Sequence, residues 1–286
     1  MKIYFSPTCP RQQDYSIVAM IHYLGYSVVK SASEEFDFAY LWQDATKLSP
    51  SAELWEIAKY KPVLNLYCQD ISKRKVEQVW QQVCGYSSLL DPSQHQGKAL
   101  KKFDDNGKGG GEVIDCPILL SDVDAACVYQ ALIQTSDADQ QMEYRLPYIM
   151  GRMPLVFEVL KDDPEHVPER RIQNQFKRSI TPRPSDEVFS ELELAQIMQF
   201  CQELGFDIGE LDILRCRHSQ RMYIIDANTT PTYFNMFNRY WRTADKRMAL
   251  HSLAQCWEQQ LIAALAATSD TPSDLTENEY AARLTA

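Results

Sequence analysis

The chain has 286 residues, of which 45% are apolar and 24% are charged, and its formal net charge is -10. A chain of this length can bury two or three packed cores, and this composition argues against general disorder. The acidic balance argues against general nucleic-acid binding, which requires Lys and Arg to neutralise phosphates. Any anionic ligand must therefore be held by a local cluster of positive groups.

The eight cysteines are scattered along the chain, and none forms a Cys-x-x-Cys pair. This usage is typical of free thiols in a reducing compartment, because a disulfide framework or a zinc site needs clustered spacing. The N-terminus lacks the apolar run of a signal peptide, and no segment approaches the ~20 apolar residues of a membrane span. We therefore expect a cytoplasmic protein without a membrane or nucleic-acid partner.

The first 70 residues alternate between strand and helix patterns, which is typical of a small α/β lobe. The expected helices are Gln13–Leu24, which stops at Gly25, and Ala52–Lys59. The expected strands are Lys2–Ser6, Tyr26–Val29, Phe38–Trp42 and Val63–Tyr67.

A glycine-rich loop between two strands marks residues 71–130. The segment begins with a helix over Ser72–Val83, followed by a strand over Gly97–Asp105. The loop Asn106–Gly111 leads into a second strand, Glu112–Ile114, and Cys127–Gln134 is a third strand candidate.

Residues 131–267 begin with an antiparallel pair that turns at Gly151 and end with a long amphipathic helix. Between them, we expect residues 170–184 to form a basic loop and Ser185 to cap a helix that ends before Gly205. The expected elements are the strands Tyr144–Met150, Pro154–Lys161, Leu211–Cys216 and Met222–Ala227, and the helices Ser185–Leu204 and Ala244–Ala267. Residues 268–286 form a polar tail.

Two strands of a predicted hairpin carry acidic residues within apolar runs. Asp212 and Asp226 lie on adjacent strands, and side-chain alternation places Asn228 on the same face as Asp226. A carboxylate within an apolar strand is costly unless it meets a cation or hydrogen-bond donors. Two carboxylates and an amide oxygen suit Mg²⁺ held together with nucleotide phosphates. The alternative is a pair of strand-end acids that bond to a turn.

The strand before the glycine loop is basic. Lys101 and Lys102 precede Gly109, Gly110 and Gly111. Glycines let the backbone approach phosphates and direct N–H groups at them, while the lysines add charge. The loop is not a Walker A motif, because a strand follows it. A surface hairpin turn rich in Gly and Lys is the alternative.

Taken in order, the glycine loop between strands and the later Asp…Asp-x-Asn hairpin resemble the ATP-grasp superfamily. The resemblance runs from about Lys61 to Phe234 and implies an α+β, ATP-grasp fold, in which two α+β subdomains clasp ATP. By this resemblance, residues 1–70 form a preceding α/β lobe, 71–130 a lid subdomain, and 131–267 a C-terminal subdomain.

The resemblance also implies roles for individual residues. Lys101 or Lys102 would contact the α- and β-phosphates, and we favour Lys102 because Leu100 would share its face. The three glycines would cover the phosphates. The remaining nucleotide-binding residues implied are Lys73, before the lid, and the adenine-reading hinge formed by Gln130, Leu132 and Ile133. Lys73 could instead be a solvated lysine of a first helical turn.

Two arginines are catalytic candidates by the same resemblance. Arg145 matches the position of an arginine near the transferred phosphate, and Arg178 belongs to a basic stretch that could close over the acceptor. A surface arginine and a solvated basic loop are the alternatives. The metal ligands implied are Asp212, Asp226 and Asn228.

Three departures from the superfamily pattern bear on the acceptor chemistry. No glycine follows soon after Asn228, Asp226 stands where Glu is usual, and Glu210 stands where some ligases place an arginine. The function implied is an ATP- and Mg²⁺-dependent ligase that activates a carboxylate as an acyl phosphate for capture by an amine. A small-molecule or sugar kinase and a non-catalytic nucleotide-binding or interaction protein are the alternatives. The helix Ala244–Ala267 could pack between copies in a homo-oligomer.

Overall fold

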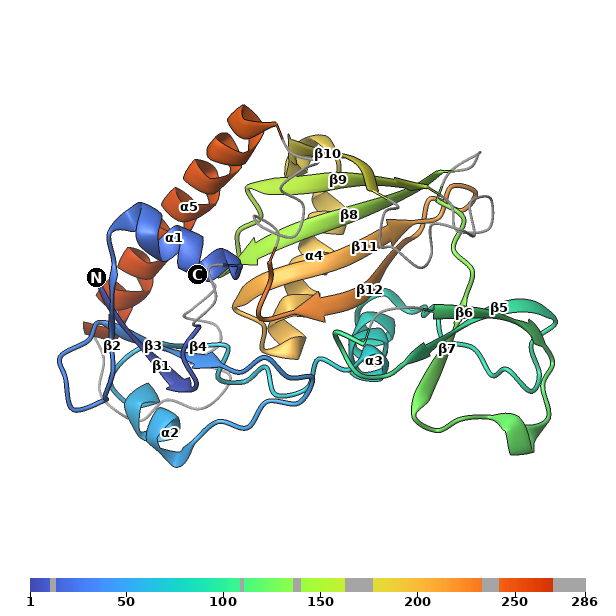
Figure 1. Cartoon of the computed structure of the whole chain (residues 1–286), viewed down its shortest axis with the longest axis horizontal. Helices are drawn as coiled ribbons and strands as arrows, with labels where there is room; N and C mark the ends of the chain where they lie inside the picture. The colour runs from blue at the N-terminus through green and yellow to red at the C-terminus, as the bar shows by residue number, and fades with distance from the viewer. Residues whose placement is uncertain (11–13, 109–110, 136–139, 163–176, 233–241, 270–286) are drawn as a thin grey trace.

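The computed structural model describes residues 1–10, 14–108, 111–135, 140–162, 177–232 and 242–269 (Figure 1). The helices are α1 (Ser16–Leu24), α2 (Ala52–Ala58), α3 (Lys73–Cys84), α4 (Glu191–Leu204) and α5 (Thr243–Ser269). The strands are β1 (Lys2–Pro7), β2 (Ser27–Val29), β3 (Phe38–Trp42), β4 (Val63–Leu64), β5 (Gly97–Phe103), β6 (Gly111–Cys116), β7 (Cys127–Ala131), β8 (Gln140–Ile149), β9 (Leu155–Asp162), β10 (Lys177–Pro184), β11 (Ile208–Arg215) and β12 (Met222–Asn228).

The N-terminal sheet is parallel and has the strand order β2-β1-β3-β4. Every residue of β3 is buried, which is typical of a parallel strand covered on both faces. The chain runs from β1 to one side for β2 and to the other side for β3. The carboxyl ends of β1 and β3 therefore meet at a topological switch point, where parallel sheets generally bind ligands.

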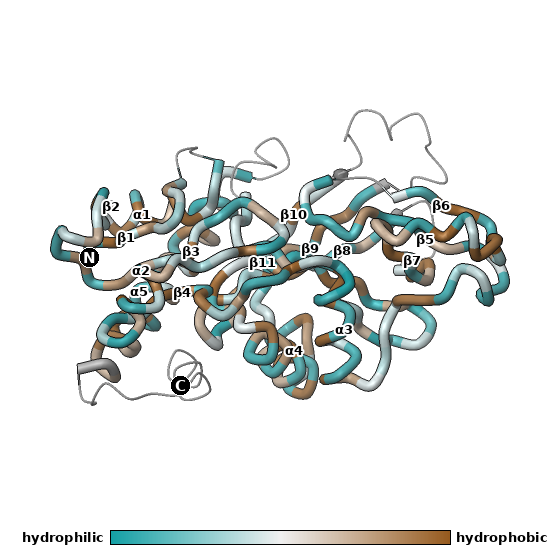
Figure 2. The backbone as a smooth tube through the Cα atoms, turned by 90° about the horizontal axis from the view of Figure 1, so that it is seen from below, coloured by the Kyte–Doolittle hydropathy of each residue, from teal (hydrophilic) through white to brown (hydrophobic). Residues whose placement is uncertain are grey.

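The other two sheets are antiparallel. The three-stranded sheet has the order β6-β5-β7, and the five-stranded sheet has the order β10-β9-β8-β11-β12. Figure 2 shows α3 and α4 side by side below the strands of the larger sheet, where the rings of Trp80 and Phe200 are 6.0 Å apart. The helix α5 packs on α1 and on β8–β10, with Trp257 buried. The three sheets follow the order of the predicted subdomains, whose boundaries stay predictions.

A buried pair ties the N-terminal sheet to the start of β11. Asn65 has a positive φ of 58°, so its backbone N–H donates to Asp207 Oδ2 at 2.6 Å. In return, its side-chain oxygen accepts from the N–H groups of Asp207 and Ile208 at 2.8 and 3.0 Å. This Asn65–Asp207 clasp explains why β4 ends at Leu64, whereas the apolar pattern predicted a strand up to Tyr67.

The predicted start of the helix before Gly205 is wrong. The helix α4 begins at Glu191 and its cap is Ser190, because Ser190 and Glu193 form a reciprocal capping box. Ser185, the predicted cap, opens a short 3-10 turn, and its hydroxyl bonds to the backbone oxygen of Met153.

The predicted basic loop is in part a strand. The strand β10 pairs with β9 from Lys177↔Lys161 to Pro184↔Leu155, with a shift in register between Lys177 and Ser179. Pro182 and Pro184 lack backbone N–H donors, but β10 lies at the sheet edge, where missing donors are tolerated.

The predicted antiparallel pairs β8–β9 and β11–β12 are present, and Gly151 turns the first pair with a φ of 83°. All eight cysteines are free thiols, and Cys68, Cys127 and Cys201 are buried. Among the described residues, no helix combines the length and apolar character that a membrane crossing requires.

Candidate active site

The predicted acidic hairpin is formed by β11 and β12, with Asp212 directly opposite Asp226. The ladder shifts by one residue just after Asp212. At the other end of the hairpin, a Cβ on Gly209 would lie 2.3 Å from the backbone oxygen of Asn228. Only glycine permits this close approach, which fixes the position of the predicted ligand Asn228.

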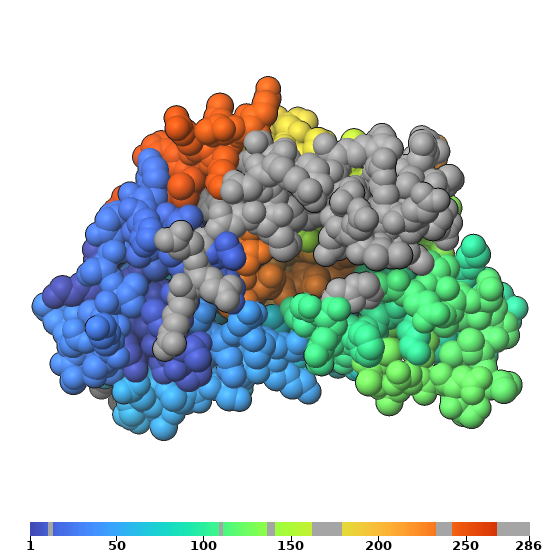
Figure 3. Space-filling view, in the orientation of Figure 1, coloured from blue at the N-terminus to red at the C-terminus, as the bar shows by residue number. Residues whose placement is uncertain are grey.

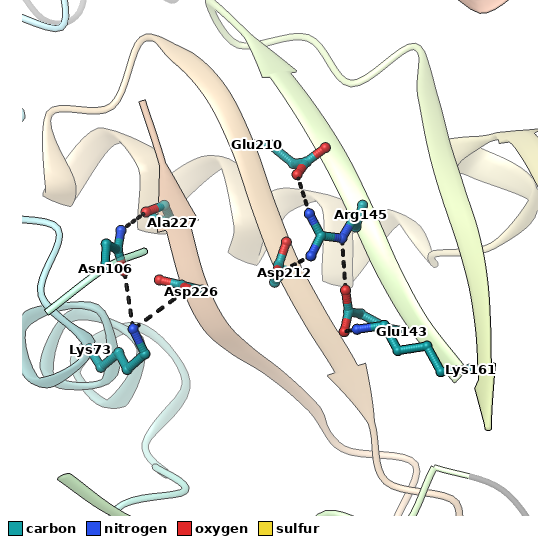
Figure 4. A network of polar contacts seen from close by, with 9 residues as sticks. All are labelled: Lys73, Asn106, Glu143, Arg145, Lys161, Glu210, Asp212, Asp226 and Ala227. Atoms are coloured by element: carbon teal, nitrogen blue, oxygen red, sulfur yellow. Dashed lines mark hydrogen bonds and ion pairs between the residues drawn. The ribbon is translucent and has the colours of Figure 1, made fainter. Parts of the chain in front are cut away.

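The start of the glycine loop lies against the hairpin (Figure 4). Asn106 donates from its side chain to the backbone oxygen of Ala227 at 2.7 Å. Lys73 Nζ donates to Asn106 Oδ1 at 3.2 Å and lies 3.6 Å from Asp226 Oδ2. Three segments distant in sequence therefore meet at β12. We name Lys73, Lys102, Asn106 and Asp226 the lysine cluster.

Burial shifts the pKa values of two residues of the lysine cluster, Asp226 and Lys102. Burial raises the pKa of Asp226 to about 6, against the opposing charge of Lys73. Burial also lowers the pKa of Lys102, and Lys73 acts in the same direction while Asp226 opposes both. The buried Oδ1 of Asp226 has no hydrogen-bond partner among the described residues. The cluster thus holds two cations and a carboxylate oxygen that a ligand could satisfy.

Arg145 lies at the centre of a second group, which we name the arginine cluster. Its guanidinium donates to Glu143, Glu210 and Asp212 at 2.8, 2.9 and 3.0 Å. Lys161 forms a further ion pair with Glu143 (Figure 4). The three carboxylates raise the pKa of Arg145 although burial opposes them. The surface alternative for Arg145 is wrong, since only 14% of its side chain is exposed.

The amide of Asn228 already has neighbours. Its Oδ1 accepts from the backbone N–H of Thr230 at 2.9 Å and lies 3.3 Å from the Thr230 hydroxyl. Within the described residues, no three His, Cys, Asp or Glu side chains converge to hold a metal ion. The predicted set of Asp212, Asp226 and Asn228 still fits Mg²⁺ that also binds phosphates, because the Oδ1 of Asp226 remains to be satisfied.

The predicted hinge continues from β7, the last strand of the three-stranded sheet. Gln130 is buried, and its side chain donates to Glu77 Oε1 at 2.7 Å. Glu77 also accepts from the Ser88 N–H at 2.9 Å. Leu132 is 39% exposed and Ile133 is partly buried. The buried Glu77 therefore fixes the start of the hinge through the side chain of Gln130.

The two candidate lysines of β5 point to different surroundings. Lys101 lies 3.8 Å from Asp124. The negative charges of Asp226 and Asp212, by contrast, raise the pKa of Lys102 against the effect of its burial. This arrangement agrees with the preference for Lys102. Gly111 opens β6 opposite Lys102. Gly109 and Gly110 lie outside the described residues, as does the side chain of Arg178.

Sequence reasoning missed two residues that shape the site, the partly buried Asn106 and the buried Glu77. Asn106 was assigned only to the loop, although its side chain joins Lys73 to β12. Glu77 lies on the apolar face of α3 and is fully buried. A carboxylate on the Val76–Val79–Trp80 face of an amphipathic helix was the one available signal for Glu77.

Comparisons with solved structures identify the fold. The structure is similar to the ATP-grasp ligase PsnB complexed with its minimal precursor, at 13% identity and a TM-score of 0.50, over 89% of this chain and 98% of that chain. It is also similar to D-alanine–D-alanine ligase from Bacillus anthracis, at 12% identity and a TM-score of 0.52, over 93% and 99% of the two chains. Neither family models nor curated protein sequences give a match.

The chain therefore has the ATP-grasp fold, which confirms the predicted α+β class. In Figure 3, the orange segment containing β11 and β12 lies in a recess between the blue N-terminal segment and the green three-stranded sheet. The lysine cluster belongs to this junction, because its members come from α3, β5, the loop after β5 and β12.

Proposed function

We propose that this protein is an ATP- and Mg²⁺-dependent ligase that activates a carboxylate as an acyl phosphate and transfers the acyl group to an amine. The contact between Lys73 and Asp226, together with the charge interaction of Lys102 with Asp226, carries the proposal. Two lysines held beside a carboxylate with a buried, unsatisfied oxygen suit polyphosphate together with a divalent ion. The shared fold with PsnB and D-alanine–D-alanine ligase supports the same reaction class.

The residues of the lysine cluster would position the nucleotide. Lys73 and Lys102 would neutralise phosphate oxygens, and glycines 109–111 would direct backbone N–H groups at them. Asp226, with Asp212 and Asn228, would hold Mg²⁺, which when bound neutralises phosphate charge. Gln130, Leu132 and Ile133 would present the adenine-reading hinge.

The chemistry requires two displacements. An acceptor carboxylate oxygen forms a bond to the γ-phosphorus while the bond from that phosphorus to the bridging oxygen breaks and ADP leaves. The free-base amine then forms the C–N bond, the acyl C–O bond breaks, inorganic phosphate leaves, and the surplus proton of the nitrogen passes to solvent. Arg145 would act mainly by orienting Asp212, since its donors already contact three carboxylates.

Nucleotide binding is the first test. ATP with Mg²⁺ should raise the unfolding temperature of the wild-type protein, because a ligand of the folded state stabilises it. Asp226→Asn should remove the Mg²⁺-dependent part of this rise. The exposed Asp122→Asn should retain it. An unchanged response of Asp226→Asn would contradict the metal assignment.

The reaction class is tested by trapping. With ATP, Mg²⁺ and candidate carboxylates, including amino acids and acidic peptides, hydroxylamine should convert an acyl phosphate to a hydroxamate. Hydroxamate together with ADP would support the ligase. A stable phosphorylated acceptor would instead indicate a kinase, and nucleotide binding without ADP release would indicate a non-catalytic protein.

A further inference from the structure

The loop after β3 brings a carboxylate to the predicted nucleotide site from the N-terminal sheet. Asp44 Oδ2 accepts from the hydroxyl of Tyr15 at 2.7 Å, and Asp44 Oδ1 accepts from the hydroxyl of Thr230 at 3.1 Å. The Thr230 hydroxyl lies between Asp44 and Asn228, 3.3 Å from the amide oxygen of Asn228. A chain of polar contacts thus runs from Tyr15 through Asp44 to a predicted Mg²⁺ ligand.

The same loop also holds the glycine loop. Thr46, two residues after Asp44, accepts from the backbone N–H of Asn106 at 2.7 Å. Asn106 in turn bonds to Lys73 and to β12. Asp44 therefore belongs to a segment fixed against both sides of the lysine cluster, and its position is set by contacts at two ends.

The position of Asp44 in the parallel sheet is independent support for a ligand site. Asp44 follows the carboxyl end of β3, and Thr8 follows the carboxyl end of β1, where its hydroxyl donates to the backbone oxygen of Trp42 at 2.8 Å. These two strand ends form the switch point of the sheet. Open parallel sheets bind ligands in the crevice outside such strand ends.

The negative charge of Asp44 favours a cationic ligand. Its two oxygens are oriented by neutral hydroxyls, and no cationic side chain among the described residues forms an ion pair with it. Its side chain is exposed, so a small ligand can reach it. A carboxylate held in this way binds an ammonium group by charge-assisted hydrogen bonds. Lys73 and Lys102, by contrast, lie near Asp226 and suit anions.

We propose that Asp44, oriented by Tyr15 and Thr230 beside the predicted Mg²⁺ ligand Asn228, binds the amine substrate as its ammonium ion before the reaction. The ammonium then loses one proton to solvent, which gives the free base that forms the C–N bond. The substrate class is accordingly a primary amine that is protonated in solution, such as an α-amino group. This inference rests on the proposed ligase function, and it assigns to the N-terminal sheet the selection of the amine.

The test uses glycinamide, a primary ammonium ion without a carboxylate, and measures its affinity by calorimetry with and without Mg²⁺ and a non-hydrolysable ATP analogue. Wild-type protein should bind glycinamide but not the neutral acetamide. Asp44→Asn should bind glycinamide about tenfold or more weakly, because a charge-assisted hydrogen bond is lost. Asp122→Asn, which removes an exposed carboxylate from the three-stranded sheet region, should bind like the wild type.

A second variant covers the case in which Asp44→Asn fails to fold. Thr230→Val keeps the charge of Asp44 but removes the hydroxyl that orients it, so glycinamide binding should weaken by less than in Asp44→Asn. Absence of glycinamide binding to the wild type, or wild-type affinity in Asp44→Asn, would overturn the inference. Failure of the ATP analogue to bind, with glycinamide binding still dependent on Asp44, would instead overturn the ligase proposal alone.

Discussion

The arginine cluster lies on β8, β9 and β11, and the lysine cluster includes Asp226 on the neighbouring strand β12. The two clusters differ in how closely their opposite charges are paired. Arg145 is surrounded by three carboxylates, each within 3.0 Å of one of its nitrogens. In the lysine cluster, Lys73 Nζ lies 3.6 Å from Asp226 Oδ2, and the other oxygen of Asp226 is buried without a hydrogen-bond partner among the described residues. We therefore expect the arginine cluster to contribute to the stability of the fold and the lysine cluster to receive a ligand.

The largest effect on stability is expected in the arginine cluster. Arg145→Met removes the counter-charge of buried carboxylates, so the free energy of unfolding should fall by about 3–5 kcal/mol, measured by urea denaturation. The matched control is Arg183→Met, which breaks a solvent-exposed pair with Glu187 and should change stability little. An unchanged urea midpoint in Arg145→Met would remove the distinction between the two clusters.

The second largest effect is an increase in stability, expected for Asp226→Asn. Because burial raises the pKa of Asp226 from 3.8 to about 6, the folded state binds its proton more tightly than the unfolded state does. The stability that this carboxyl contributes is present below pH 3.8 and is lost as the pH rises to about 6. Asp226→Asn should therefore stabilise the ligand-free protein at pH 7 by about 1–3 kcal/mol. This gain should vanish near pH 4 in urea titrations.

The control for Asp226 is Asp91, a carboxyl whose pKa is lowered instead of raised. Hydrogen bonds from Ser93 lower the pKa of Asp91, so Asp91→Asn should lose stability at pH 7 rather than gain it. If both substitutions changed stability in the same direction across this pH range, burial would not be what distinguishes Asp226.

The smallest expected change in stability is at Lys102. Burial lowers its pKa, so its charge is unfavourable in the ligand-free fold, and Lys102→Met should unfold at the wild-type urea concentration or slightly above it. The same substitution should abolish Mg²⁺·ATP binding, measured by calorimetry. Lys101→Met, on the neighbouring position that faces Asp124, should retain binding. Equal losses in both variants would contradict the assignment of Lys102 to the site.

Local patterns in the sequence predicted the strands that carry the site. Alternating apolar residues predicted the β11–β12 hairpin with Asp212 and Asp226 on adjacent strands, and the structure pairs these two residues directly. The start of α4 was misplaced because Ser185 and Ser190 are both acceptable caps, and only the reciprocal bonds of Ser190 with Glu193 distinguish them.

Contacts over long distances were beyond the reach of such patterns. The three partners of Arg145 lie at positions 143, 210 and 212, and which of them meet is decided by the pairing of β8 with β11. In the same way, nothing near Asn106 in the sequence indicates that its side chain reaches Ala227. Residue types gave a hypothesis for the chemistry of the site, which stays a prediction, while strand register determined which side chains meet.

The Asn65–Asp207 clasp has a consequence for motion. It links the loop after β4 to the first residues of β11 by three hydrogen bonds between 2.6 and 3.0 Å, all within buried surroundings. We therefore expect the N-terminal and five-stranded sheets to move together. An opening for the proposed nucleotide would then involve the three-stranded sheet, and amide hydrogens at 65, 207 and 208 should exchange with solvent only when the whole protein unfolds.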